Sequence, residues 1–126
     1  MLDTSLERQL EVVWAAGIIE GEGYIGVKKG GGDRIRCVVN VGQVYNDAMI
    51  KRLQRLWGGH IWLNTARSGY TPILRWEVSA NIAELVCREL LQCPQFQGPK
   101  RDAARALIVH RRDVSMRAGR QLELAL

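Results

Sequence analysis

Two glutamates, Glu20 and Glu22, stand one residue apart at the end of a predicted helix, and each is followed by a glycine. The last carbonyl groups of a helix have no partners within the helix, and carboxylates beside such carbonyls suit a hard divalent cation. An acid at a helix C-terminus is electrostatically disfavoured, because the negative end of the helix dipole lies there. The pair therefore indicates a metal site, and the alternative is two solvated acids at a helix end.

The helix that carries this pair is predicted from apolar residues that recur every three or four positions. It spans about residues 5–20, and Gly21 and Gly23 are expected to end it. The same helical spacing, alternating apolar and polar residues, and glycine-rich turns predict the other elements. These are strands at 24–29 and 34–43, a helix at 47–57, strands at 60–66 and 71–79, and helices at 80–91 and 100–118, with a tail at 121–126 that is expected to fray.

The predicted order of elements is α-β-β-α-β-β-α-α, within a single domain of residues 1–126. Two antiparallel hairpins backed by helices imply an α+β fold in which helices cover one face of the sheet and the other face stays open. Residues 21–26 also fit the dinucleotide-binding pattern G-x-G-x-x-G. That site needs a strand before the glycines and a helix after them, and this chain has the reverse order, so we reject a nucleotide site.

The charge balance is basic, with 18 Lys and Arg against 13 Asp and Glu and a formal net charge of +5. This excess indicates a polyanionic partner such as nucleic acid. The three cysteines form no Cys-x-x-Cys pair, and the two histidines are far apart, so no zinc site is expected. The sequence has no apolar run long enough to span a membrane and no secretion signal, so we expect an intracellular protein.

The open face of the predicted sheet carries long polar side chains. Arginine and asparagine can read guanine and adenine in the DNA major groove, and glutamate can accept a hydrogen bond from cytosine. A solvated sheet face has similar residues, which is the alternative interpretation. The candidate DNA-binding residues are Lys28, Arg34, Arg36, Asn40, Trp62, Asn64, Arg67, Arg75 and Glu77.

A second feature of the first helix is the spacing of its small residues. Val13, Gly17 and Gly21 lie four residues apart, on one helix face. Small residues at this spacing let two helix backbones approach closely. The alternative is that this face packs against the chain's own sheet.

The nonapeptide Ala15-Ala16-Gly17-Ile18-Ile19-Glu20-Gly21-Glu22-Gly23 resembles the signature of the LAGLIDADG homing endonucleases. Glu20 and Glu22 fall at its two acidic positions, where this chain has Glu in place of Asp. The order of elements over about residues 6–117 is similar to that of the family domain. The resemblance implies an αββαββα domain with an antiparallel saddle-shaped sheet backed by helices, plus a C-terminal helix.

The resemblance also implies a partner and a quaternary structure. In the family, the motif helices of two domains pack together, so a chain with one motif is expected to form a homodimer. The saddle is expected to bind double-stranded DNA in the major groove. The residues implied at the dimer interface are Val13, Gly17, Glu20 and Gly21.

The implied chemistry is hydrolysis of DNA phosphodiester bonds. Glu22 and the Gly21 carbonyl would hold Mg²⁺, with Mn²⁺ able to substitute and Ca²⁺ supporting binding only. Gln43 falls where the family often has a polar residue near the attacking water, and Lys100 falls where a family lysine reaches the scissile region. For both residues, a plain surface position is the alternative.

The leading hypothesis is therefore a homodimeric, Mg²⁺-dependent, site-specific homing endonuclease that makes double-strand breaks in a long, near-palindromic DNA target, with its gene either intron-encoded or free-standing. A second hypothesis is a non-catalytic module, either a maturase that binds intron RNA or a DNA-binding regulator. The acid at Glu22 favours the nuclease, because a regulator has no need for a carboxylate near phosphates. A third reading is a domain of unrelated function whose charge is incidental.

Overall fold

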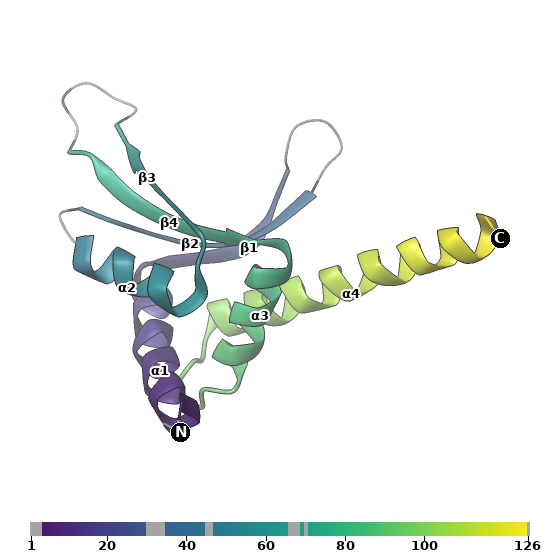
Figure 1. The fold of residues 1–126 in the computed structure, drawn as a ribbon, viewed down its shortest axis with the longest axis horizontal. Helices are drawn as coiled ribbons and strands as arrows, with labels where there is room; N and C mark the ends of the chain where they lie inside the picture. The colour runs from purple at the N-terminus through teal and green to yellow at the C-terminus, as the bar shows by residue number, and fades with distance from the viewer. Residues whose placement is uncertain (1–3, 30–34, 45–46, 66–68, 70, 126) are drawn as a thin grey trace.

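A computed structural model describes residues 4–29, 35–44, 47–65, 69 and 71–125 of the chain. Figure 1 shows the helices and strands in the predicted order, and the predicted α+β class is confirmed. In chain order the elements are α1 Thr4–Glu22, β1 Gly23–Lys29, β2 Ile35–Gln43, α2 Asp47–Trp57, β3 His60–Asn64, β4 Ile73–Ser79, α3 Ala80–Leu91 and α4 Pro99–Ala125.

The four strands form one antiparallel sheet in the order β1-β2-β4-β3. The two hairpins join along β2 and β4, where Asn40 lies opposite Glu77. The helices lie on one side of the sheet, and the two hairpins splay apart at its opposite ends (Figure 1). The sheet thus has one covered face and one open face, as the sequence pattern predicts, and its open face has the saddle shape that the resemblance implies.

The covered face is formed by alternate residues of each strand. Cys37, Val39 and Val41 of β2 are buried, as are Trp76 and Val78 of β4. Successive side chains of a strand point to opposite faces, so these five point toward the helices. They form one cluster with the buried sides of the four helices, and this core fixes which strand residues remain on the open face.

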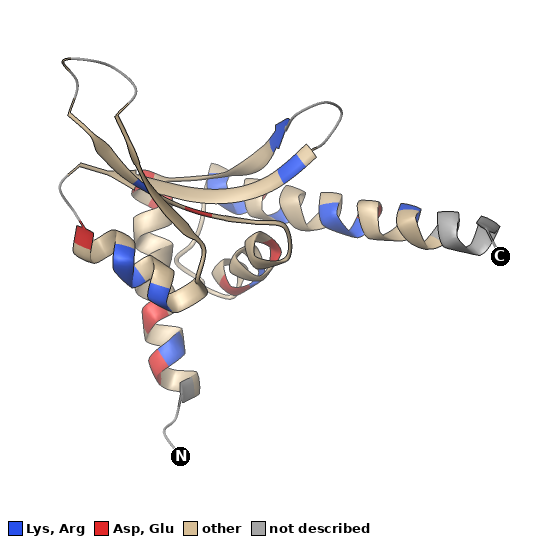
Figure 2. Ribbon diagram, turned by 45° about the horizontal axis from the view of Figure 1, so that its top comes forward, with Lys and Arg blue, Asp and Glu red and all other residues tan. Residues whose placement is uncertain are grey.

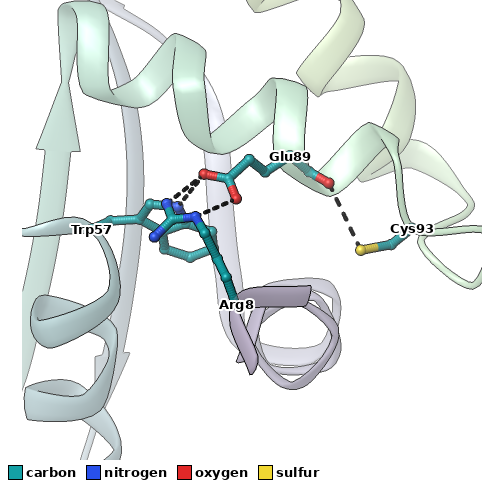
Figure 3. Close-up of polar contacts among 4 residues, drawn as sticks. All are labelled: Arg8, Trp57, Glu89 and Cys93. Carbon is teal, nitrogen blue, oxygen red and sulfur yellow. Dashed lines mark hydrogen bonds and ion pairs between the residues drawn. The ribbon is translucent and has the colours of Figure 1, made fainter. Parts of the chain in front are cut away.

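Polar contacts hold α1 against its two neighbouring helices. The Glu89 carboxylate of α3 accepts hydrogen bonds from Arg8 of α1, at 2.7 and 3.0 Å, and from Trp57 Nε1 of α2, at 3.1 Å (Figure 3). Arg52 Nε of α2 donates to Glu11 of α1 at 2.9 Å, and the hydrogen bonds from Arg52 lower the pKa of the Glu11 carboxyl. The position of α1 beneath the sheet is therefore fixed by α2 and α3 together.

Several predicted boundaries are wrong. Gly21 does not end α1, which runs to Glu22 and passes directly into β1. The strands β3 and β4 are shorter than predicted: β3 ends at Asn64, and β4 begins at Ile73. Pro72 precedes β4, and proline has no N–H group to donate to the sheet. The predicted fraying tail is helical as far as Ala125, and residues 121–125 are Gln, Leu, Glu, Leu and Ala, all good helix formers.

None of the helices in the described part of the chain combines the length and the apolarity that crossing a membrane requires.

Candidate active site and nucleic-acid interface

The predicted acidic pair lies at the C-terminal end of α1. Glu20, Gly21 and Glu22 are all exposed, and Glu22 is the last residue of the helix. The helix continues without a loop into β1, an edge strand of the sheet. The Glu22 carboxylate is thus held at a junction of two regular elements, in a position open to solvent and to a ligand.

Gly23 makes this direct junction possible. A Cβ atom on residue 23 would lie 2.7 Å from the Ile19 carbonyl oxygen and 2.8 Å from the Ile19 Cα atom. Both are backbone atoms, so they cannot move aside as the end of a side chain can. The helix ends directly before Gly23, as the sequence predicts, and the structure adds that Gly23 allows a close approach between the strand and the last turn of the helix.

We expect Gly23→Ala to destabilise the fold by about 1–3 kcal/mol, the usual cost of overpacking a tight contact. Urea unfolding of the two proteins measures the difference. Gly119→Ala is the matched control, because a Cβ there meets nothing within 4 Å and alanine gains up to about 1 kcal/mol in a helix. Equal stability of Gly23→Ala and the wild type would show that the junction is not tight.

The structure brings Lys100, from the first turn of α4, to the same end of α1. Its Nζ donates hydrogen bonds to the carbonyl oxygens of Ile19 at 2.9 Å and of Glu20 at 2.6 Å. These carbonyls belong to the negative end of the helix dipole, where a cation is favoured. The ammonium group thus occupies the electronegative helix end next to Glu22, and a catalytic role for Lys100 stays a prediction.

Gln43 is the last residue of β2, at the edge of the same region. Gly23 pairs with Val41, so Gln43 lies two residues further along β2, toward the level of the α1 C-terminus. Its side chain is half-buried. The register thus places Gln43 at the same end of the sheet as Glu22, and its role near a water stays a prediction.

A single chain offers few metal ligands. Among the described residues, no three His, Cys, Asp or Glu side chains converge as a metal-binding group. The cysteines are buried, and burial raises the pKa of the Cys87 thiol to about 12, so that thiol is protonated at neutral pH. The ligands that do fit a hard cation are the exposed Glu22 carboxylate and the carbonyl of Gly21, at the negative end of α1.

The open face of the sheet carries seven of the nine candidate DNA-binding residues. The strand pairing puts them on the face away from the helices, while Arg34 and Arg67 lie outside the described residues. Figure 2 shows basic residues near the tips of β1 and β2 and along α4. The residues on the open face are Lys28, Arg36, Asn40, Trp62, Asn64, Arg75 and Glu77.

Two aromatic residues on the open face were missed as candidates. The Tyr24 ring lies under the Lys28 ammonium group, with 5.3 Å between Nζ and the ring centroid. His60 stacks on Trp62, with ring centroids 5.4 Å apart. The strand alternation already places Tyr24 and His60 on this face, so the signal was present in the sequence.

One side of α1 is left largely exposed by the other described elements. Leu6, Leu10 and Val13 are 55%, 62% and 43% exposed, and they share a helix face with the exposed Gly17 and Gly21. A Cβ at either glycine would meet nothing within 4 Å. The alternative that this face packs against the chain's own sheet is therefore wrong, because α1 turns its opposite side, including Ala15 and Ile19, to the core.

This arrangement of helices and strands is the fold of the LAGLIDADG homing endonucleases. In I-CvuI, solved with the I-CreI target DNA and Mg, 84% of this chain matches 68% of that chain at 16% identity and a TM-score of 0.68. I-SmaMI bound to cleaved DNA matches over 85% of this chain and 37% of its own, at 18% identity and a TM-score of 0.65. The group I intron-encoded I-CeuI, complexed with DNA, matches over 90% of this chain and 59% of its own, at 15% identity and a TM-score of 0.65. Neither a protein-family model nor a curated protein sequence matches the chain.

Proposed function

We propose that this protein is a homodimeric, Mg²⁺-dependent DNA endonuclease that cuts one long, near-palindromic target. The observation that carries the proposal is the junction of α1 and β1. There an exposed carboxylate at a cation-attracting helix end adjoins an open sheet face with basic and amide side chains. DNA complexes of proteins with the same fold support this assignment.

Recognition is assigned to the open face of the sheet. The major groove admits a two-stranded antiparallel ribbon, so the hairpins of the sheet can enter it, and arginine and asparagine side chains distinguish base pairs there. Each subunit would read one half-site of about ten base pairs if its saddle covers one helical turn. The two subunits of a symmetric dimer would then read a target with matching two-fold symmetry.

Cleavage is assigned to the acidic ends of two α1 helices brought side by side. Glu22 and the Gly21 carbonyl of each chain would hold the ion, and DNA phosphates and the second chain would complete its ligands. When bound, the ion supplies Lewis-acid activation of water and of the scissile phosphate. Gln43 would orient the attacking water, and Lys100 would offset the negative charge that develops on the phosphate.

The test starts from a randomised pool of DNA duplexes. The protein is first allowed to select duplexes in Ca²⁺, and the selected duplexes are then incubated with Mg²⁺ and analysed for double-strand breaks. The proposal expects enrichment of a near-palindrome and its cleavage in both strands. Selective binding without any cleavage in Mg²⁺ or Mn²⁺ would favour the DNA-binding regulator, and preferential binding of intron RNA would favour the maturase.

Arg75 is the clearest single reader of bases on the open face. It lies opposite Trp62 in the sheet and makes no hydrogen bond or ion pair with the other described residues. We expect Arg75→Ala to reduce discrimination at one base pair of each half-site by about 1–3 kcal/mol, the range for a bidentate base contact. Binding of singly substituted duplexes measures this loss.

Arg88→Ala is the control for Arg75→Ala, because Arg88 carries the same charge on α3, where it pairs with Glu84. We expect the Arg88 variant to keep the base preference of the wild type. Unchanged preference in the Arg75 variant would mean that the open face around β4 does not read sequence.

A further inference from the structure

Three polar residues of the open face do not act as independent readers, because they converge on one carboxylate. Glu77 Oε2 accepts a hydrogen bond from Arg36 Nη2 at 2.7 Å. Glu77 Oε1 lies 3.9 Å from Lys28 Nζ and accepts a hydrogen bond from Asn40 Nδ2 at 3.4 Å. We call these four residues, Lys28, Arg36, Asn40 and Glu77, the Glu77 cluster.

The side chains of the Glu77 cluster lie along the surface of the sheet. Lys28 and Arg36 are opposite each other in one row, and Glu77 and Asn40 are opposite each other two rows away. The row between them holds Gly26, Val38 and Ser79, so the two basic side chains must extend across Val38 to reach the carboxylate. This explains why Val38 has 0% exposure although it points away from the helical core.

The members of the cluster differ in their exposure to a ligand. The Glu77 side chain is 13% exposed, whereas those of Arg36 and Lys28 are 52% and 48% exposed. The carboxylate thus accepts two hydrogen bonds, lies beside the Lys28 ammonium group and is turned away from solvent. The Arg36 guanidinium is bound through Nη2, and its other nitrogens have no partner among the described residues.

We propose that Glu77 is a specificity-determining positioning residue that restrains Arg36 and Lys28. This inference rests on the proposed function of the open face in DNA binding. The carboxylate takes one N–H of Arg36 Nη2 and so fixes the plane of the guanidinium, leaving Nη1 and the second N–H of Nη2 to face a base edge in the planar fork geometry that guanine recognition requires. It also cancels one of the two positive charges, which limits attraction to phosphates of any sequence.

Glu77 has a different role from the one its residue type suggests, which is to accept a hydrogen bond from cytosine. In the structure the Glu77 oxygens are already used by protein donors, and little of the side chain is exposed. Glu77 therefore acts through Arg36 and Lys28 rather than by touching a base. Removing its charge should release two flexible cations onto the phosphate backbone.

The test compares Glu77→Gln with the wild type on two probes. These are the duplex that the wild type selects from the randomised pool and a shuffled duplex of the same composition, both in Ca²⁺ over a series of salt concentrations. We expect affinity for the shuffled duplex to rise by about two- to fivefold, the scale of one exposed charge contact. The salt slope should steepen by about 0.9 for each additional phosphate neutralised, and the preference for the selected duplex should fall by about tenfold.

A double-mutant cycle separates the positioning role from a simple change in net charge. In the Lys28→Ala/Arg36→Ala background, Glu77→Gln should leave affinity for the shuffled duplex unchanged, because the cations it would release are gone. Glu7→Gln is the matched control for charge, since Glu7 is exposed near the N-terminal end of α1. Urea unfolding shows whether each variant is folded.

Several outcomes would overturn the proposal. One is a Glu77→Gln variant with the base preference and salt slope of the wild type. Others are a gain in affinity that persists without Lys28 and Arg36, or an equal gain from Glu7→Gln. A wild-type protein that selects a duplex while Glu77→Gln shows no effect would remove this inference and leave the proposed function intact. A wild type that selects no duplex would overturn both.

Discussion

We expect Glu22→Gln to abolish DNA cleavage while leaving affinity for the target nearly unchanged. Glutamine has almost the shape of glutamate, but it carries no charge, so it would hold a divalent cation far more weakly than the carboxylate. The loss should reach about three orders of magnitude or more, because metal activation contributes several kcal/mol and each 1.36 kcal/mol is worth a factor of ten in rate. Plasmid cleavage in Mg²⁺ and a gel shift in Ca²⁺ measure the two quantities separately.

Glu20→Gln is the matched control for this experiment. Glu20 is exposed at the same end of α1. Glu22 is the last residue of the helix, whereas Glu20 lies two residues earlier. We expect its replacement to affect cleavage much less, since the resemblance assigns Glu20 to the helix interface. Normal cleavage by Glu22→Gln would remove the proposed active site and leave the fold assignment untouched.

We expect Gly17→Leu to convert the proposed homodimer to a monomer and thereby eliminate double-strand cleavage. A leucine there fits the single chain, because a Cβ at residue 17 meets nothing within 4 Å. In a symmetric dimer the same change occurs twice at one interface, and overpacking costs about 1–3 kcal/mol per site. The dimer dissociation constant should therefore rise by roughly 30-fold to 10⁴-fold.

Sedimentation of the wild type and Gly17→Leu at micromolar concentration tests this expectation. Gly119→Leu is the control, because that glycine is equally open but lies on α4. Urea unfolding shows whether the Gly17→Leu chain still folds. We expect its helix α1 to be stabilised, because leucine has a higher helix propensity than glycine. A wild type that sediments as a monomer with and without DNA would contradict the proposed homodimer.

The sequence by itself determined the features that depend on local periodicity. The 3.6-residue spacing in α1 placed Val13, Gly17 and Gly21 on one helix face, and the two-residue alternation in the strands placed Arg75 and Asn40 on the open face. Both periods follow from backbone geometry alone, so they can be read without knowledge of tertiary contacts. The same helical period predicts a helix that ends close to the acidic pair, which the residue types themselves identify.

Tertiary structure alone decided which residues of distant segments meet. Lys100 reaches carbonyl groups 80 and 81 residues earlier in the chain, and Arg36 reaches Glu77 across 41 residues. These contacts depend on the pairing of β2 with β4 and on where α4 begins beneath the sheet, and a local pattern of apolar residues specifies neither. The role of Gly23 likewise depends on tertiary structure. A Cβ at residue 23 is excluded by Ile19, and this contact exists only when the helix and the strand are packed together.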